Sequence, residues 1–343
     1  MRALVVGGGS WGTAFACVLA RRGHVVTLGV RDPEAARSMA RDRTNARYLP
    51  DVPLEALVTP VALDLPRNCQ GAELVVLAVP SRSFASVAGQ LRLDDGAMAL
   101  SLTKGLEPQS GALLLDVLAE RGGIDPDCTA FLTGPNHAEE IGKGHPAASV
   151  LTSPNSAAAT RLQSLLTGGM FRVYRSDDVV GVQLCAAAKN VIAVAAGASD
   201  GLGFGDNAKA ALITRGLAEM ARLGGAFGAD PRTYAGLAGM GDLVATCTSR
   251  HSRNRAAGEQ IAQGIAPGEI EGRLGMAVEG LATAPALRGL GLERAVELPI
   301  TESVCAVIDG MPLAEALLGL LGRVPASEHD ASRVVPAPDL TVD

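Results

Sequence analysis

The sequence predicts an α/β domain with a doubly wound parallel sheet in its first half and an all-α domain in its second. Short apolar, β-rich runs alternate with helical stretches up to about residue 176, a pattern typical of parallel strands covered by helices on both faces. Beyond that point helical spacing continues, divided by Gly and Pro, and no further strands are indicated. We therefore expect domains at residues 1–180 and 181–330, followed by a flexible tail at 331–343.

The individual elements follow from this change of pattern. We expect strands at residues 3–7, 25–30, 74–79, 97–103, 129–134, 147–153 and 171–176. We expect helices at residues 178–199, 208–227, 254–264, 279–295, 299–309 and 312–322. Ligands of doubly wound sheets bind at the carboxyl ends of the strands, so side chains just beyond those ends are the first candidates for a site.

Composition excludes several classes of protein. With 48% hydrophobic and 19% charged residues, the chain is globular rather than disordered. Its net charge of −6 argues against general binding to nucleic acid or acidic membranes. The six cysteines are scattered and no signal peptide is visible in MRALVVGGGS, so we expect reduced thiols and a cytoplasmic protein. The most apolar stretch, residues 179–198, carries three polar side chains near its centre, which favours a buried helix over stable membrane insertion.

The first chemical signal is a glycine motif directly after the first expected strand. Gly7, Gly9 and Gly12 fit G-x-G-x-x-G and open a helix that ends near Gly23, before a second strand. The first glycine permits a tight turn, the second a close approach of a pyrophosphate to the backbone, and the third close helix packing. The free N–H groups at the helix start can bind the anion. The sequence thus predicts a Rossmann-type dinucleotide site.

The end of the second strand bears on cofactor choice. An NAD-selective site usually has Asp or Glu there, whereas here Val30 is followed by Arg31. Arg31 could pair with a 2′-phosphate, or it could stack on the adenine or face solvent. We therefore expect NADP(H), NAD(H) or both as cofactor.

Polar residues also follow two later strands. Lys104 lies just beyond the strand at 97–103, Gly134 ends the strand at 129–134, and Asn136 follows it in the next turn. A further polar group lies in the second half and consists of Asp242, followed by Ser252, Arg253 and Asn254 at the start of an expected helix. Arg beside Ser and Asn at a helix N-terminus suits a phosphate, although a solvated Arg and an ordinary helix cap would look the same.

Lys189 stands out because it interrupts a run of small apolar residues, QLCAAAKNVIAVAAG. On a helix its neighbours one turn away, such as Ala186 and Ala193, are small and apolar, so its charge needs a partner or a ligand. One hypothesis is a structural ion pair with Asp242 or Glu140. The hypothesis that we favour is a functional ammonium, and the two can coexist.

Several of these segments resemble one family. GGGSWGTA, LTKGLEP, TGPNHAEE, VQLCAAAKNVIAVAAGASDGLGFGDNAKAALITRGLAEM, GMGDLVATCTSRHSRNR and VEG occur in the order seen in bacterial NAD(P)-dependent glycerol-3-phosphate dehydrogenases, and the resemblance runs from residue 1 to about 324. It implies a Rossmann-type domain, a helical domain like that of 6-phosphogluconate dehydrogenase, and a homodimer. It also implies a small phosphorylated three-carbon substrate, because that family interconverts dihydroxyacetone phosphate and sn-glycerol 3-phosphate for phospholipid synthesis.

The resemblance also implies roles for individual residues. Lys189 resembles the catalytic proton donor and acceptor. Substrate contacts are implied for Lys104, Gly134, Asn136, Lys189, Asp242, Ser252, Arg253 and Asn254. Cofactor contacts are implied for Gly7, Gly9, Ser10, Trp11, Gly12, Arg31, Lys104, Ala138, Arg253 and Glu279, with Tyr48 and Ala277 as weaker candidates. No metal ligand is implied.

Two positions depart from the family pattern. Asn136 stands where the family often has Ser or Thr, so we expect altered detail in the substrate loop. The strand 25–30 lacks the Trp often found at its end, which leaves cofactor preference open. Two other functions stay open: a related dehydrogenase acting on another phosphorylated ketone or on a 2-keto or 3-hydroxy acid, and a non-catalytic NADP(H)-binding sensor.

Overall fold

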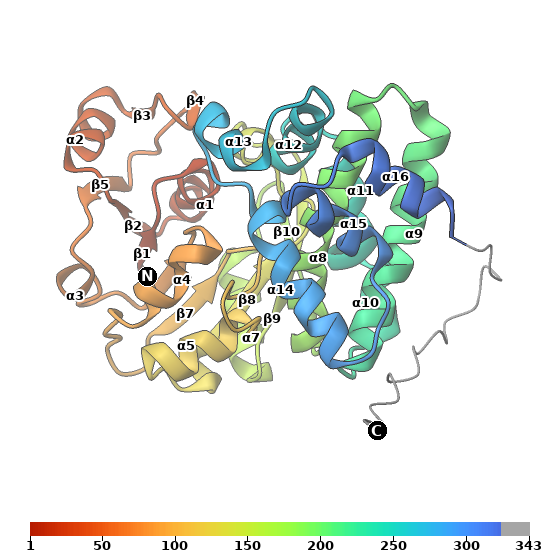
Figure 1. The fold of residues 1–343 in the computed structure, drawn as a ribbon. Coiled ribbons are helices and arrows are strands. Elements are labelled where there is room, and N and C mark those ends of the chain that lie inside the picture. The colour runs from red at the N-terminus through yellow and green to blue at the C-terminus, as the bar shows by residue number, and fades with distance from the viewer. Residues whose placement is uncertain (324–343) are drawn as a thin grey trace.

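The computed structural model describes residues 1–323, and its first half is built on one eight-stranded sheet (Figure 1). The strands are β1 (Arg2–Val6), β2 (Val25–Val30), β5 (Val58–Ala62), β6 (Leu74–Leu77), β7 (Met98–Ser101), β8 (Thr129–Thr133), β9 (Ala147–Thr152) and β10 (Phe171–Ser176). Their order is β10-β9-β8-β7-β6-β1-β2-β5, so the direction of winding reverses between β1 and β6. The doubly wound sheet is confirmed, and the reversal creates the crevice in which such sheets bind ligands.

Helices cover both faces of the sheet. Buried side chains of α1 (Ser10–Arg21), α2 (Pro33–Asp42), α6 (Ala138–Gly142) and α7 (Ser156–Leu166) pack on one face. The other face is covered by α3 (Leu65–Asn68), α4 (Ser81–Ala88), α5 (Leu114–Gly122) and the long helix α8 (Val179–Gly201). The second face is therefore shared between the two halves of the chain.

Two expectations about the sheet were wrong. β9 runs antiparallel to β8, because the connection between them holds only the five-residue helix α6, which does not carry the chain back along the sheet. The sheet also contains β5, and a separate two-stranded ribbon is formed by β3 (Thr44–Asn45) and β4 (Leu49–Pro53); none of these strands was predicted. Both β4 and β5 contain proline, which argues against a central strand, and neither was therefore predicted. In the structure β5 lies at the edge of the sheet, where proline is tolerated.

The second half is helical throughout the described residues. After α8 come α9 (Gly205–Ala226), α10 (Pro231–Ala235), a π-helical turn at Leu237–Gly241, and α11 (Asp242–Thr248). Then follow α12 (Arg253–Ala262), α13 (Pro267–Leu274), α14 (Glu279–Glu293), α15 (Pro299–Ile308) and α16 (Leu313–Leu321). The helical domain is confirmed, although the short helices α10, α11 and α13 were not predicted. The expected tail at 331–343 lies outside the described residues.

Helix α8 is the centre of this half and packs against α9, α11, α12 and α14. It is long and apolar enough to span a membrane, with a mean hydropathy of 1.7 over its most apolar window, but 83% of that window is buried inside the molecule. Asp178 caps its start by accepting a hydrogen bond from the backbone N–H of Gly181. It is therefore built as the core helix of a folded domain.

Candidate active site

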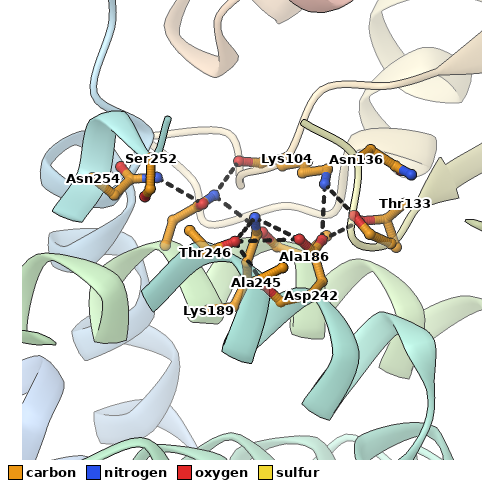
Figure 2. A network of polar contacts seen from close by, with 12 residues as sticks. Lys104, Thr133, Asn136, Ala186, Lys189, Asp242, Ala245, Thr246, Ser252 and Asn254 are labelled. Carbon is orange, nitrogen blue, oxygen red and sulfur yellow. Dashed lines mark hydrogen bonds and ion pairs between the residues drawn. The ribbon is translucent and has the colours of Figure 1, made fainter. Parts of the chain in front are cut away.

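Lys189 and Lys104 meet on a single carboxylate, that of Asp242 (Figure 2). Lys189 Nζ donates to Asp242 Oδ1 at 2.9 Å from the middle of α8. Lys104 Nζ, from the loop after β7, donates to Asp242 Oδ2 at 2.8 Å. Residues far apart in the sequence thus form one cluster where the carboxyl end of the sheet meets the helical half.

The start of α11 positions Asp242. The aspartate directly follows the π-helical turn and lies one helical turn before Thr246, so both side chains face α8. Lys189 Nζ also donates to Thr246 Oγ1 at 2.7 Å. Asp242 Oδ2 accepts a further hydrogen bond from Thr133 Oγ1 at 3.0 Å. The Asp242 side chain is 2% exposed and both of its carboxylate oxygens are engaged, so it holds the two lysines in place.

The cluster keeps an excess of positive charge, with two ammonium groups around one carboxylate. Burial lowers the pKa of Lys104 to about 8, against the opposing effect of Asp242. Burial alone would raise the pKa of Asp242, but the positive charges of the two lysines hold that pKa at about 2. The site therefore suits an anionic substrate or a transition state in which negative charge develops.

A second polar chain links α8 to α12 and α14. Asn190 Nδ2 donates to the backbone oxygens of Lys104, at 2.9 Å, and Ala186, at 3.1 Å. Asn190 Oδ1 accepts from Asn254 Nδ2 at 2.8 Å, and Asn254 Oδ1 accepts from the Gly280 N–H at 2.8 Å. Asn254, expected as a substrate contact, is thus firmly tied to the protein, with one N–H of its amide left over.

The N-terminus of α12 faces the same region. Ser252 caps the helix by accepting a hydrogen bond from the Arg255 N–H at 3.2 Å, and its side chain is buried. Arg253 is exposed, and its guanidinium has no hydrogen bond or ion pair among residues 1–323. An unpaired guanidinium at the start of a ten-residue helix is suited to hold a phosphate.

The glycine loop after β1 has the shape that a dinucleotide pyrophosphate requires. Gly7 has φ +122°, a conformation that favours glycine, and a Cβ at Gly12 would collide with the Gly7 oxygen. A Cβ at Gly9 would meet nothing within 4 Å, and the backbone N–H groups of Gly8 and Gly9 have no partner among the described residues. Unpaired amides beside open space fit an anion at the start of α1.

Comparison with known proteins agrees with this geometry. The family models described as NAD-dependent glycerol-3-phosphate dehydrogenase N-terminus and C-terminus match residues 3–159 and 178–318. The chain belongs to this dehydrogenase family. It is therefore an NAD(P)-dependent oxidoreductase with the Rossmann-type and helical domains that the sequence predicts.

Individual relatives cover nearly the whole chain. A glycerol-3-phosphate dehydrogenase [NAD(P)+] of Chlorobium limicola is 43% identical over 332 residues, 96% of this chain and 99% of the relative. One from Escherichia coli O1:K1 / APEC is 45% identical over 331 residues, 95% of this chain and 97% of the relative. The crystal structure of the Coxiella burnetii glycerol-3-phosphate dehydrogenase superposes with a TM-score of 0.89 at 38% identity, covering 94% and 99% of the two chains.

In this dehydrogenase the remaining expected cofactor contacts lie just after a strand or at the start of a helix. Ser10 and Trp11 begin α1, and Arg31 is an exposed residue just after β2. Glu279, at the start of α14, accepts hydrogen bonds from the Ser81 N–H at 3.0 Å and the Ser81 hydroxyl at 2.5 Å. Burial raises the pKa of Glu279. Glu279 thus joins the helical half to the start of α4.

The weaker candidates differ in their surroundings. Tyr48 is half-buried in the β3–β4 ribbon, with the Arg47 guanidinium 5.0 Å from the centre of its ring. Ala277 is half-buried just before α14. Neither makes a polar side-chain contact that identifies a role.

The substrate loop after β8 is shaped by Gly134 and Asn136. Gly134 has φ +140°, and its backbone oxygen accepts from Lys104 Nζ at 2.8 Å. Asn136 Nδ2 donates to Ser149 Oγ on β9 at 2.9 Å, so the amide is tied to the sheet. Ala138, buried at the start of α6, packs into the same region.

An open cleft of about 410 Å³ lies beside this loop. It is lined by Pro135, His137, Glu140, Ala245, Thr248, Ser249, Arg250 and His251. His137 Nε2 contacts the Ala245 backbone oxygen at 3.2 Å, and burial lowers the His137 pKa. Neither His137 nor His251 was among the predicted site residues.

Sequence reasoning also missed Thr246 and Thr133, which complete the contacts around Lys189 and Asp242. The spacing of Thr246, four residues after Asp242, was the available signal, because it places both on one face of a helix. That signal was lost because α11 itself was not predicted.

Proposed function

We propose that this chain reversibly reduces dihydroxyacetone phosphate to sn-glycerol 3-phosphate with NAD(P)H, and that Lys189 is the proton donor and acceptor. The observation that carries the proposal is the pattern of hydrogen bonds made by the Lys189 ammonium. Its ammonium has three N–H donors, of which Asp242 and Thr246 take two. The third remains for a substrate oxygen. The names of the relatives support the same reaction.

The chemistry of the Lys189 cluster follows from its charge. When bound, the reduced nicotinamide supplies a hydride. As the substrate carbonyl is reduced, its oxygen gains negative charge, which the Lys189 ammonium stabilises and then neutralises by giving up a proton. Lys104 adds a second positive charge, and Asp242 fixes both lysines before the substrate arrives. In the reverse direction neutral Lys189 accepts the hydroxyl proton.

The phosphate of the substrate would be held at the start of α12. Arg253 offers an unpaired guanidinium, and Ser252 fixes the helix start next to it. Anchoring the phosphate there holds the reacting carbon in one orientation relative to Lys189. This group distinguishes the proposed substrate from 2-keto and 3-hydroxy acids, which carry no phosphate.

Replacing Lys189 tests the proton role. We expect Lys189→Ala to lower kcat for dihydroxyacetone phosphate reduction by about 10²–10⁴-fold, because proton transfer and oxyanion stabilisation are lost together. NADPH affinity should stay within twofold. The measurements are initial rates with saturating NADPH, and calorimetric titration of the cofactor to show that the variant is folded. Lys143→Ala, which removes a surface ammonium paired with Asp51, is the control. A near-normal rate in folded Lys189→Ala would refute the assignment.

Replacing Arg253 tests the substrate class. We expect Arg253→Ala to raise KM for dihydroxyacetone phosphate by about 10–100-fold, because a charge-assisted contact to the phosphate is lost. Arg273→Ala, which removes a guanidinium from α13, should leave KM unchanged. If Arg253→Ala hardly changed KM and a 2-keto acid were the better substrate, the related-dehydrogenase hypothesis would replace ours. Cofactor binding without turnover of any phosphorylated ketone would favour the sensor.

We further propose that the enzyme acts in the cytoplasm as a homodimer and supplies glycerol 3-phosphate for phospholipid synthesis. The free cysteines and the burial of α8 are consistent with such a location. Light scattering of the purified protein would give its mass in solution, for comparison with 35.0 kDa for one chain.

A further inference from the structure

Residues 43–54, which hold the β3–β4 ribbon between α2 and β5, send one side chain into the glycine loop. The ribbon lies beside α1 (Figure 1), and β4 contacts both α1 and α6. Within it Asn45 is only 3% exposed, although it belongs to a surface connection. A buried amide in such a place must have its hydrogen bonds satisfied.

The partners of Asn45 lie on the dinucleotide side. Asn45 Nδ2 donates to the backbone oxygen of Gly8 at 2.9 Å and to Thr13 Oγ1 at 2.8 Å. Asn45 Oδ1 accepts from the Tyr48 N–H at 3.2 Å. One side chain therefore joins the ribbon, the glycine loop and the first turns of α1.

The contact to Gly8 has a geometric consequence for the next peptide group. The Gly8–Gly9 peptide is trans, so the Gly8 C=O and the Gly9 N–H point in opposite directions. Holding the carbonyl against Asn45 therefore turns the Gly9 N–H away from the ribbon. This N–H has no partner among the residues that the structure describes, and a Cβ at Gly9 would enter open space.

We propose that Asn45 is a positioning residue that orients the Gly8–Gly9 peptide to receive the cofactor pyrophosphate. Glycines lose more backbone freedom on ordering than other residues, so a run of three would otherwise sample several peptide orientations. Asn45 fixes one of them before binding, which removes an entropic cost from cofactor association. The inference rests on the proposed role of Gly7, Gly9 and Gly12 in binding the cofactor.

The test separates the Asn45 contact from the stability of the ribbon. We expect Asn45→Ala to raise the Kd for NADPH about tenfold, because the loop amide loses its fixed orientation. KM for dihydroxyacetone phosphate and kcat at saturating NADPH should stay within twofold. The matched control is Arg43→Ala, whose guanidinium holds the other side of the same segment by donating to the Val58 and Glu55 oxygens at 2.9 and 2.5 Å. This control should leave the Kd for NADPH unchanged.

Two results would overturn the inference: an unchanged Kd in Asn45→Ala, or an equal rise in Arg43→Ala at similar thermal stability. A third variant, Gly9→Val, separates this failure from failure of the proposed cofactor site. Gly9 has φ −76° and open space around it, so valine should fit the free protein and block a pyrophosphate. If Gly9→Val bound NADPH normally, the loop assignment itself would be wrong. If only Gly9→Val weakened binding, the loop would stand and the role of Asn45 would fall.

Discussion

Lys189 and Asp242 show how a residue unusual in the sequence acquires its meaning from a partner 53 positions away. An ammonium among alanines is costly to bury, and the structure satisfies it with a carboxylate and a hydroxyl. The ion-pair hypothesis for Lys189 is therefore confirmed, with Asp242 rather than Glu140 as the partner, and the pair is compatible with the proposed catalytic role. Because the same carboxylate also binds Lys104, the cluster remains cationic and chemically useful.

The pKa of Lys104 near 8 predicts how activity depends on pH. Below pH 8 Lys104 is mostly charged, so in the proposed reaction it assists binding of the anionic substrate, whereas above pH 8 this charge is lost. We expect kcat/KM for dihydroxyacetone phosphate to fall as pH rises through about 8, approaching tenfold per pH unit. The measurement is a rate profile from pH 6.5 to 9.5, made also for Lys104→Arg. Arginine stays charged throughout this range, so its profile should lose the fall near 8. An identical fall in both proteins would assign it to another group.

At the scale of elements, close helix packing brings the site residues together. A Cβ at Gly258 on α12 would collide with the Val194 oxygen of α8, and one at Gly280 on α14 would collide with the Asn190 oxygen. Missing side chains at these crossings let α12 and α14 approach α8 closely enough for the Asn190–Asn254–Gly280 chain of hydrogen bonds. Packing therefore places the start of α12, where we propose that the phosphate binds, relative to Lys189.

Gly258→Ala tests this contact. We expect it to lower the free energy of unfolding by about 1–3 kcal/mol, because a methyl group is forced against the backbone of α8. Gly289→Ala, in the interior of α14 with nothing within 4 Å of its added Cβ, should instead be neutral or stabilising by about 0.5–1 kcal/mol. The measurement is the free energy of unfolding of both variants, obtained from urea denaturation. Equal effects at the two positions would show that helix propensity rather than close packing governs Gly258.

For the molecule as a whole, one apolar core connects the two halves. Side chains on one face of the sheet, such as Phe131, and on α4, such as Phe84, belong to the same buried cluster as Val182 and Ile192 of α8. Polar contacts also cross between the halves, including Glu279 with Ser81. The halves share their interior instead of meeting across a separable interface.

This shared core predicts a single unfolding transition. The only tryptophan, Trp11, reports on the sheet domain, while far-UV circular dichroism is dominated by helices, most of them in the second half. In urea we expect the two signals to have coincident midpoints, because neither half keeps its core without the other. Midpoints separated by more than the error of the fits would show that the halves unfold independently.

The local pattern of the chain was enough to predict the central elements and the chemical character of the site. Continuous apolar runs indicated the inner strands, the glycine spacing indicated the dinucleotide loop, and Lys189 was visible because a charge contradicts its surroundings. The family motifs added the reaction. These signals are local in the sequence, so they can be recognised without knowledge of the fold.

Which groups meet depends on packing in three dimensions. Local periodicity does not encode the neighbours of an element in space. The direction of β9, the proline-containing strand β5 and the short helix α11 all depend on such neighbours. Thr246 and Asn45 look ordinary in the sequence, because a hydrogen bond depends on distance and direction in space. The type of fold and the need for a partner at Lys189 follow from local patterns in the chain. The packing of α8 between the sheet and its neighbouring helices decided that this partner is Asp242, shared with Lys104.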